Sequence, residues 1–240
     1  MDITWSVAGG TIGVAAGLLL RATVFRLSVA PGSPDRSACA KCAAPVWGRF
    51  AVRCAHCHGW YGVPLVLEAL TAAVFVVLIW RFGGLLDVAP YAFVGALGVA
   101  LAVVDIDVQR LPNALTLPLY PGLVALFGVV AVVEGRPGDL VRAVLGGLVL
   151  GGCYLALAVA SGGRLGGGDV KLAGGLGIAL GWLGWPALFA GTLLGFLSMG
   201  LVGAGLVVAR RVTLQQTVSF GPFMLGGALL AVLGSGPGTW

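Results

Sequence analysis

The feature that most restricts the fold of this chain is its series of long apolar runs, separated by short polar segments. A helix that crosses a bilayer needs about 20 apolar residues, and only helices and closed barrels satisfy their backbone hydrogen bonds there. The chain is 59% hydrophobic and 10% charged, whereas a soluble domain carries about 25% charge. We therefore expect an all-α polytopic membrane helix bundle with about eight transmembrane helices, at 4–25, 64–81, 88–105, 114–133, 141–160, 172–186, 188–209 and 218–235.

The positions of the basic residues predict how these spans are oriented. If the segment 26–63 is cytoplasmic, eleven of the fourteen basic residues lie on the cytoplasmic side. Cytoplasmic loops are enriched in lysine and arginine. We therefore expect both termini outside the cell membrane. No basic stretch or small-residue cleavage site marks the first run as a signal peptide, so it is expected to be a span. The net charge of +5 does not indicate a nucleic-acid partner, because the basic residues are spread among loops.

Four of the five cysteines lie in the segment 26–63 as two Cys-x-x-Cys pairs. They are Cys39, Cys42, Cys54 and Cys57. Two such pairs at this spacing are typical of a tetrahedral zinc site with four thiolate ligands. The segment is too short for a core of its own, and a structural zinc ion would order it. Two disulfides are the alternative, which a reducing cytosol disfavours. His56 and His58 flank Cys57 and are either substitute ligands or loop residues.

Acidic residues mark the end of one apolar run and the start of another. Asp105 and Asp107 end the third span, before Pro112 and Asn113 begin the next. Residues i and i+2 of a helix do not share a face, so one acid is expected to face the bundle interior. Asp105 is the better candidate because it lies nearer the apolar run, and Asp107 is either part of a site or interfacial. Glu68, in the second span, is either a polar contact in the bundle or part of the site.

A further acid lies in the stretch Gly166-Gly167-Gly168-Asp169-Val170-Lys171. An ionisable side chain in a span costs about 2.5–3.5 kcal/mol at mid-helix, so Asp169 is expected to have a function. The glycines permit a tight bend and the close approach of another chain. We expect them to shape a substrate-side loop at the cytoplasmic boundary. Lys171 is expected to orient this loop or to extend its charge to water.

Asp105 and Asp169 are predicted to act as a pair at the cytoplasmic face. Two carboxyl groups held close together share a proton, so one serves as base toward water and the other as acid toward a carbonyl. This predicts amide hydrolysis without a metal ion. Carboxylates in membranes also relay protons or bind cations, so a proton- or cation-coupled transporter is the alternative. A third hypothesis is a scaffold whose zinc loop binds a partner.

These motifs together resemble those of the type IV prepilin peptidase family. The residues Gly166-x-Gly168-Asp169-x-Lys171 match the GxGD motif of membrane aspartic proteases, and Asp105 precedes Pro112-Asn113 at the family's spacing. The double Cys-x-x-Cys segment is similar to that of the bacterial members. Two further stretches are similar to family motifs, Tyr61 to Glu68 and Phe220-Gly221-Pro222-Phe223.

The resemblance implies an aspartic endopeptidase that removes the short leader of type IV prepilins or pseudopilins at the cytoplasmic membrane face. Asp105 and Asp169 would be the catalytic residues, with Gly166, Gly168, Lys171, Asp107, Pro112, Asn113 and Glu68 in support. Many bacterial members also N-methylate the new terminus with S-adenosylmethionine. The implied division is a methyltransferase-like region at 1–80 and a peptidase bundle at 81–240. A homo-oligomer is left open.

The chain departs from the family pattern in the part linked to methylation. Arg21 stands where bacterial members usually have an asparagine, and the gap between the two cysteine pairs is shorter than usual. The resemblance therefore predicts the peptidase step more directly than methyl transfer, which stays open.

Overall fold

The computed structural model describes residues 3–30, 32–46, 52–62, 65–83, 86–162, 165–209 and 219–235. All regular elements of this part of the chain are helices, apart from two isolated β-bridges. The chain forms two compact units, Met1–Leu115 and Thr116–Trp240, here named unit 1 and unit 2. The division expected from the sequence, into a methyltransferase-like region at 1–80 and a peptidase bundle at 81–240, concerns activities rather than packing and stays a prediction.

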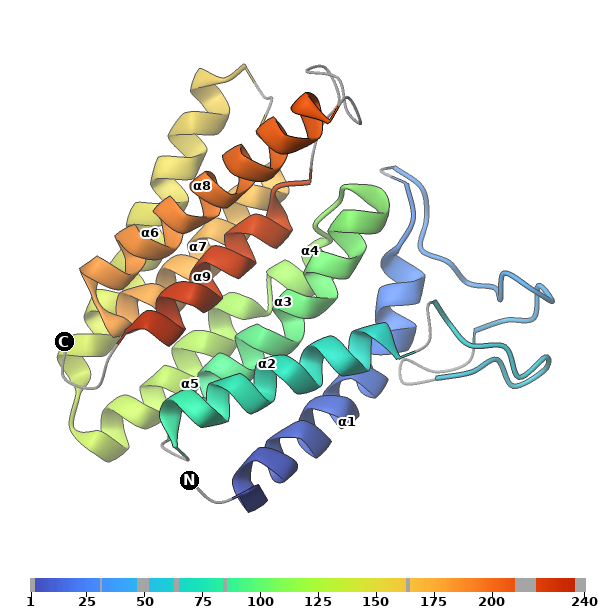
Figure 1. Cartoon of the computed structure of the whole chain (residues 1–240), viewed down its shortest axis with the longest axis horizontal. Coiled ribbons are helices and arrows are strands. Elements are labelled where there is room, and N and C mark those ends of the chain that lie inside the picture. Colours follow the sequence, from blue (N-terminus) through green and yellow to red (C-terminus); the bar gives the residue numbers. More distant parts are fainter. Residues whose placement is uncertain are drawn as a thin grey trace. The chain divides into compact units, whose positions relative to one another are not determined.

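Unit 1 contains α1 (Ile3–Leu27), α2 (Val66–Phe82) and α3 (Val88–Val108). Figure 1 shows the segment between α1 and α2 extending from one end of this helix pair. Small residues let α1 approach α2 closely, because a Cβ at Gly13 would lie 2.6 Å from the Cα of Ala72. A Cβ at Gly17 would likewise lie 2.7 Å from the Cα of Glu68. The short helix α4 (Asn113–Thr116) lies at the boundary of the two units.

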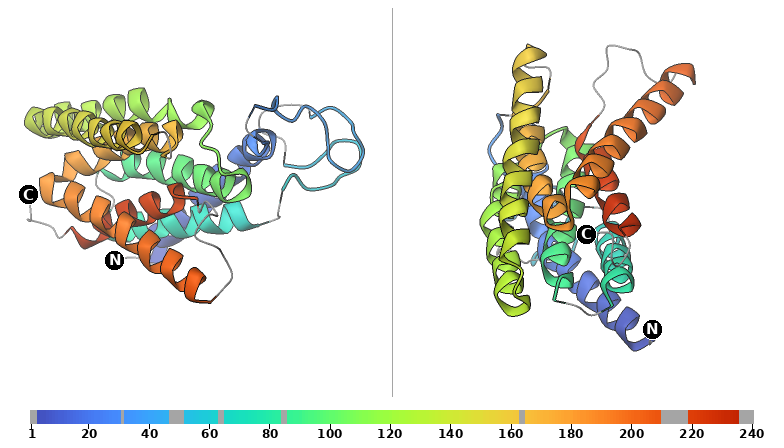
Figure 2. Two further views of the ribbon diagram at one scale, coloured as in Figure 1. Left: turned by 90° about the horizontal axis from the view of Figure 1, so that it is seen from above. Right: turned by 90° about the vertical axis from the view of Figure 1, so that its left-hand side faces the viewer.

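Unit 2 contains α5 (Leu119–Glu134), α6 (Pro137–Ala160), α7 (Gly167–Leu183), α8 (Trp185–Val208) and α9 (Gly221–Gly234). Helix α7 contacts each of the other four helices, and every residue from Leu172 to Leu183 is buried. Its closest neighbour is α6, which runs beside it in Figure 2. A Cβ at Gly177 would lie 2.5 Å from the carbonyl oxygen of Gly146. Close approach of small residues is how helices pack tightly in lipid, and α7 is the central helix of unit 2.

The all-α bundle predicted from the apolar runs is confirmed. Each of the eight expected runs forms a helix, and the fourth is divided into α4 and α5 at Leu117–Pro118. Five segments in the described residues are long and apolar enough to cross a membrane, namely α1, α3, α4 with α5, α6 and α8. Helices α2 and α7 have 17 residues each and α9 has 14. Pro64, the expected start of the second span, and Val63 lie outside the described residues.

Candidate active site and metal centre

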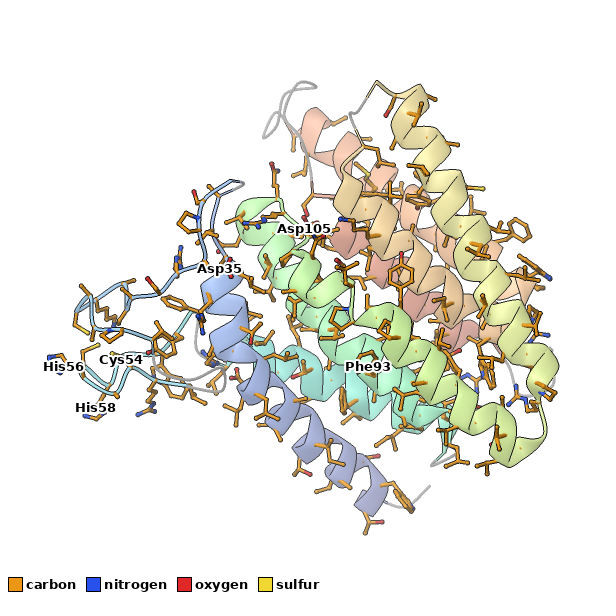
Figure 3. The ribbon with its side chains drawn as sticks, turned by 180° about the vertical axis from the view of Figure 1, so that it is seen from behind. Asp35, Cys54, His56, His58, Phe93 and Asp105 are labelled. Carbon is orange, nitrogen blue, oxygen red and sulfur yellow. The ribbon has the colours of Figure 1, made fainter. Side chains whose placement is uncertain are left out.

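Asp105 lies in the last full turn of α3, in unit 1 (Figure 3). Its side chain is buried, with 5% of the residue exposed, whereas Asp107 is exposed. This difference agrees with the two-residue spacing of the acids on a helix. Helix α3 ends at Gln109, whose left-handed backbone (φ 50°) lets its N–H donate to the carbonyl oxygen of Asp105 at 2.8 Å. Pro112 is buried, and the exposed Asn113 begins α4.

Asp169 lies in the first turn of α7, in unit 2. Gly166 is the N-cap, with extended backbone, and its carbonyl oxygen accepts the N–H of Asp169 at 3.0 Å. A Cβ at Gly166 would lie 3.2 Å from Oδ2 of Asp169, so the glycine leaves room for the carboxylate. The expected loop therefore ends at Gly166, because Gly167 and Gly168 are already helical. Negative side chains are favoured in a first helical turn, where backbone N–H groups lack helical partners.

Aromatic side chains make contacts near the start of α7 and near the start of α9, both in unit 2. The hydroxyl of Tyr120, on α5, donates to the carbonyl oxygen of Lys171 at 2.7 Å. Phe220, at the N-cap of α9, is buried against Tyr154 and Phe196, at ring centroid distances of 6.1 and 5.1 Å. Tyr120 is not among the site residues expected from the sequence. A tyrosine near the start of an apolar run is a sequence signal for such a hydrogen bond, because a tyrosine hydroxyl removed from water generally finds a partner.

Glu68 forms a buried ion pair with Arg21, and each residue is 3% exposed. Nε of Arg21 donates to Oε1 of Glu68 at 2.7 Å, and its NH2 group donates to Oε2. The NH1 group of Arg21 donates to the carbonyl oxygen of Tyr61 at 2.9 Å. The structure therefore shows Glu68 in a polar contact within unit 1, and its supporting role in the site stays a prediction. The pairing with Arg21 was not predicted, although opposite charges in two neighbouring apolar runs are a usable signal for it, because a buried charge needs a partner.

The two cysteine pairs form two equivalent turns. In the first, the N–H of Cys39 donates to the carbonyl oxygen of Ala44 at 2.8 Å, and in the second that of Cys54 donates to Gly59 at 2.9 Å. The residue four positions after each first cysteine, Ala43 or His58, has a left-handed backbone with φ of 57° and 53°. The two segments therefore repeat one knuckle conformation, as a site with two Cys-x-x-Cys pairs requires.

The four sulfur atoms converge to distances that fit a zinc ion. All lie within 4.8 Å of one another. The shortest separations are 3.7 Å between Cys39 and Cys57 and 3.6 Å between Cys42 and Cys54. A tetrahedral site with Zn–S bonds near 2.3 Å places its sulfurs about 3.8 Å apart. The cysteines are free thiols rather than disulfides, so this donor set fits a structural zinc ion.

Backbone N–H groups and neighbouring sulfurs shift the pKa values of Cys39, Cys42 and Cys54 in different directions. The N–H groups of Cys57 and His56 lower the pKa of Cys54 to about 6. Those of Lys41 and Cys42 lower the pKa of Cys39. The N–H of Ala44 acts in the same direction on Cys42, but burial and the other three sulfurs outweigh it and raise the pKa of Cys42 to about 12. Four clustered sulfurs thus need a cation before all can ionise, and a metal ion would supply it.

The knuckles are attached to the end of α1 by a small apolar cluster, formed by Phe25, Cys39, Cys54 and Tyr61. The rings of Phe25 and Tyr61 lie 4.8 Å apart. His56 and His58 are exposed at the outer end of the loop (Figure 3) and do not belong to the sulfur cluster. They are therefore loop residues in this conformation, and the sulfur cluster that could hold a metal ion consists of the four cysteines predicted from the sequence.

Comparison with known proteins places the chain in a family. The model of the type IV leader peptidase family matches residues 91–208, a range that includes Asp105 and Asp169. A prepilin leader peptidase/N-methyltransferase of Aeromonas hydrophila is 32% identical over 82% of this chain and 62% of its own length. The protein of the same name from Aeromonas salmonicida (strain A449) is 32% identical over 82% of this chain and 71% of its own length.

A Pectobacterium carotovorum relative with that name is 29% identical over 97% of this chain and 94% of its own. The chain thus spans less than two thirds of the Aeromonas hydrophila protein but nearly all of the Pectobacterium one. No solved structure shows significant similarity to the chain. The Aeromonas salmonicida relative is 32% identical and is covered over 71% of its length, and on this relative the chain belongs to the type IV leader peptidase family.

Proposed function

We propose that the chain is a membrane aspartic endopeptidase that cleaves the leader of type IV prepilins or pseudopilins at the cytoplasmic face of the cell membrane. The observation that carries this proposal is the placement of two acids at the ends of apolar helices. Asp105 ends α3 and is buried, and Asp169 begins α7 beside the room left by Gly166. The matched range of the family model includes both residues.

The proposed mechanism requires the two carboxyl groups to share one proton during cleavage of the scissile peptide. The ionised carboxylate takes a proton from water, which attacks the peptide carbonyl, and the protonated one donates toward the carbonyl oxygen. Collapse of the tetrahedral intermediate breaks the C–N bond. The departing amine takes the proton that the first carboxyl group received from water, and a hydroxyl of the intermediate returns its proton to the second carboxylate as the new carbonyl forms. The chemistry needs no metal ion at the aspartates, and the zinc that fits the cysteines would be structural.

The relatives' names add an N-methyltransferase activity. For this chain, methylation of the new N-terminus, with S-adenosylmethionine as donor, is a second proposal. It would concern unit 1, which contains the knuckles and the Arg21–Glu68 pair. A homo-oligomer is a further possibility that the size of a purified particle would test.

Co-expression with a prepilin, followed by mass spectrometry of the product, tests the proposal. We expect the wild-type chain to yield a shortened pilin, and Asp105→Asn and Asp169→Asn each to leave the leader in place while the protein still inserts. These substitutions keep the shape of the side chain and remove its acid–base chemistry. Asp107→Asn is the matched control and should retain most of the cleavage, because Asp107 is exposed. Cleavage at the normal rate by Asp169→Asn would refute the paired mechanism, and the same spectrum reports methylation.

A further inference from the structure

Helix α7 is held near Asp169 by a side chain from another helix. Tyr120, the second residue of α5, donates its hydroxyl to the carbonyl oxygen of Lys171 at 2.7 Å. Lys171 follows Asp169 by two residues and lies in the same part of α7. A carbonyl oxygen has two lone pairs, so it accepts the hydroxyl in addition to a helical N–H.

The facing surface of α7 is shaped for this contact. A Cβ at Gly174 would lie 2.2 Å from the hydroxyl oxygen of Tyr120 and 3.0 Å from the ring carbon that bears it. At the next residue, Gly175, a Cβ would lie 3.2 Å from Cδ1 of Leu119. The start of α5 therefore lies directly against the backbone of α7. Any larger residue at Gly174 would displace the tyrosine.

The opposite end of α7 is held in a similar way. Arg142, on α6, donates through Nε to the carbonyl oxygen of Gly181 at 2.9 Å and through NH2 to that of Trp182 at 2.7 Å. Side chains of two neighbouring helices thus contact backbone carbonyls near both ends of α7. Sliding or rotation of α7 against α5 would break the Tyr120 contact, which is the one on the Asp169 side.

We infer that Tyr120 is a positioning residue, whose hydroxyl sets the orientation of the turn that carries Asp169. This inference rests on the proposed function, because it gives Asp169 a catalytic role. Tyr120 acts through the backbone of Lys171 and takes no part in proton transfer. Its loss should therefore affect turnover more than substrate binding, because small displacements of a catalytic group reduce the rate of the chemical step.

The test is steady-state cleavage of a purified prepilin by Tyr120→Phe, in detergent micelles. We expect kcat to fall about tenfold, within the roughly hundredfold that small displacements can cost, with KM changed less than about twofold. Tyr91→Phe is the matched control. It removes the hydroxyl of a buried tyrosine on α3, about 20 Å along that helix from Asp105, and should leave kcat unchanged. Equal kcat values for Tyr120→Phe and the wild type would overturn the inference, as would equal losses in both variants.

Two further variants make the outcome specific. Gly174→Ala should lower kcat as Tyr120→Phe does, because the new Cβ expels the hydroxyl. The double variant should then be little worse than either single one, because both remove the same contact. Additive losses would show that Gly174 and Tyr120 act separately and would contradict the inference. Asp169→Asn, assayed in parallel, tests the proposed function alone: if it cleaves normally, the catalytic assignment fails whatever Tyr120→Phe shows.

Discussion

At the scale of single residues, the Arg21–Glu68 pair is the most buried charged contact in the described part of unit 1. Removing one member of a buried ion pair leaves an uncompensated charge, which costs about 3–5 kcal/mol, whereas replacing both by apolar groups is often nearly neutral. We therefore expect Arg21→Met to lower the free energy of unfolding in detergent by about that amount. The double variant with Glu68→Leu should regain most of the loss.

Arg36→Gln is the control for this pair, because Arg36 is exposed and its guanidinium lies 5.1 Å from the ring of Phe25. It should change the free energy of unfolding by less than about 1 kcal/mol. Similar stabilities of Arg21→Met and wild type would contradict the structural role of the pair. A double variant that folds but does not cleave prepilin would instead give Glu68 a role in the site.

At the scale of elements, the contact of α6 with α7 depends on glycines that leave no space. A Cβ at Gly177 would lie 2.5 Å from the carbonyl oxygen of Gly146, and backbone cannot yield as a side chain does. Gly177→Ala should therefore destabilise unit 2 by about 1–3 kcal/mol, the usual cost of overpacking. Denaturation in mixed micelles measures it.

The matched control is Gly152→Ala on α6. Gly152 is exposed, and a Cβ there meets nothing within 4 Å. The same substitution should be neutral or slightly stabilising, because alanine is a better helix former than glycine. If Gly177→Ala were as stable as Gly152→Ala, the prediction that stability depends on the close contact of α6 with α7 would be wrong.

At the scale of the whole molecule, the four-cysteine cluster that fits zinc belongs to unit 1 alone. The knuckles contact α1 through Phe25 and Tyr61, so removal of zinc by a chelator should speed amide exchange in 32–46, in 52–62 and at the end of α1. The core of α7, Leu172–Leu183, should exchange as before because it is buried within unit 2. Hydrogen-exchange mass spectrometry reads both regions in one sample. Cys39→Ser with Cys42→Ser should reproduce the metal-free pattern.

The same site predicts a pH dependence. The pKa of Cys54 is lowered from 9.0 to about 6, so its thiolate stabilises the folded loop fully above pH 9. This contribution is lost as the pH falls through about 6. Zinc content should thus be retained at neutral pH and fall in more acidic solution, as metal binding requires deprotonated thiols.

In the hydrogen-exchange experiment, amide exchange that rises in α7 as much as in the knuckles after zinc removal would show that the two units are not independent in stability.

The sequence by itself determined the features that depend on local pattern. Apolar runs long enough to cross a membrane predict the helices, because backbone groups in lipid must be satisfied within each segment. That Asp105 and Asp107 differ in burial follows from helix geometry, and that Asp105 is the buried acid follows from its place nearer the apolar run. The convergence of the four cysteines could be predicted because each knuckle is a short stretch of chain. The paired action of Asp105 and Asp169 stays a prediction.

Only the tertiary structure decided which distant residues meet. It joined Arg21 to Glu68, placed Tyr120 against the backbone at Lys171, and made α7 the central helix of unit 2. It also began α7 at Gly167, so that Asp169 lies in a helical turn rather than in a loop. Apolar spans look alike in sequence. Lipid is as apolar as their side chains, so the hydrophobic effect does not favour burying one face of a span over another. Their neighbours are therefore chosen by the close fit of small residues and by the pairing of buried polar groups.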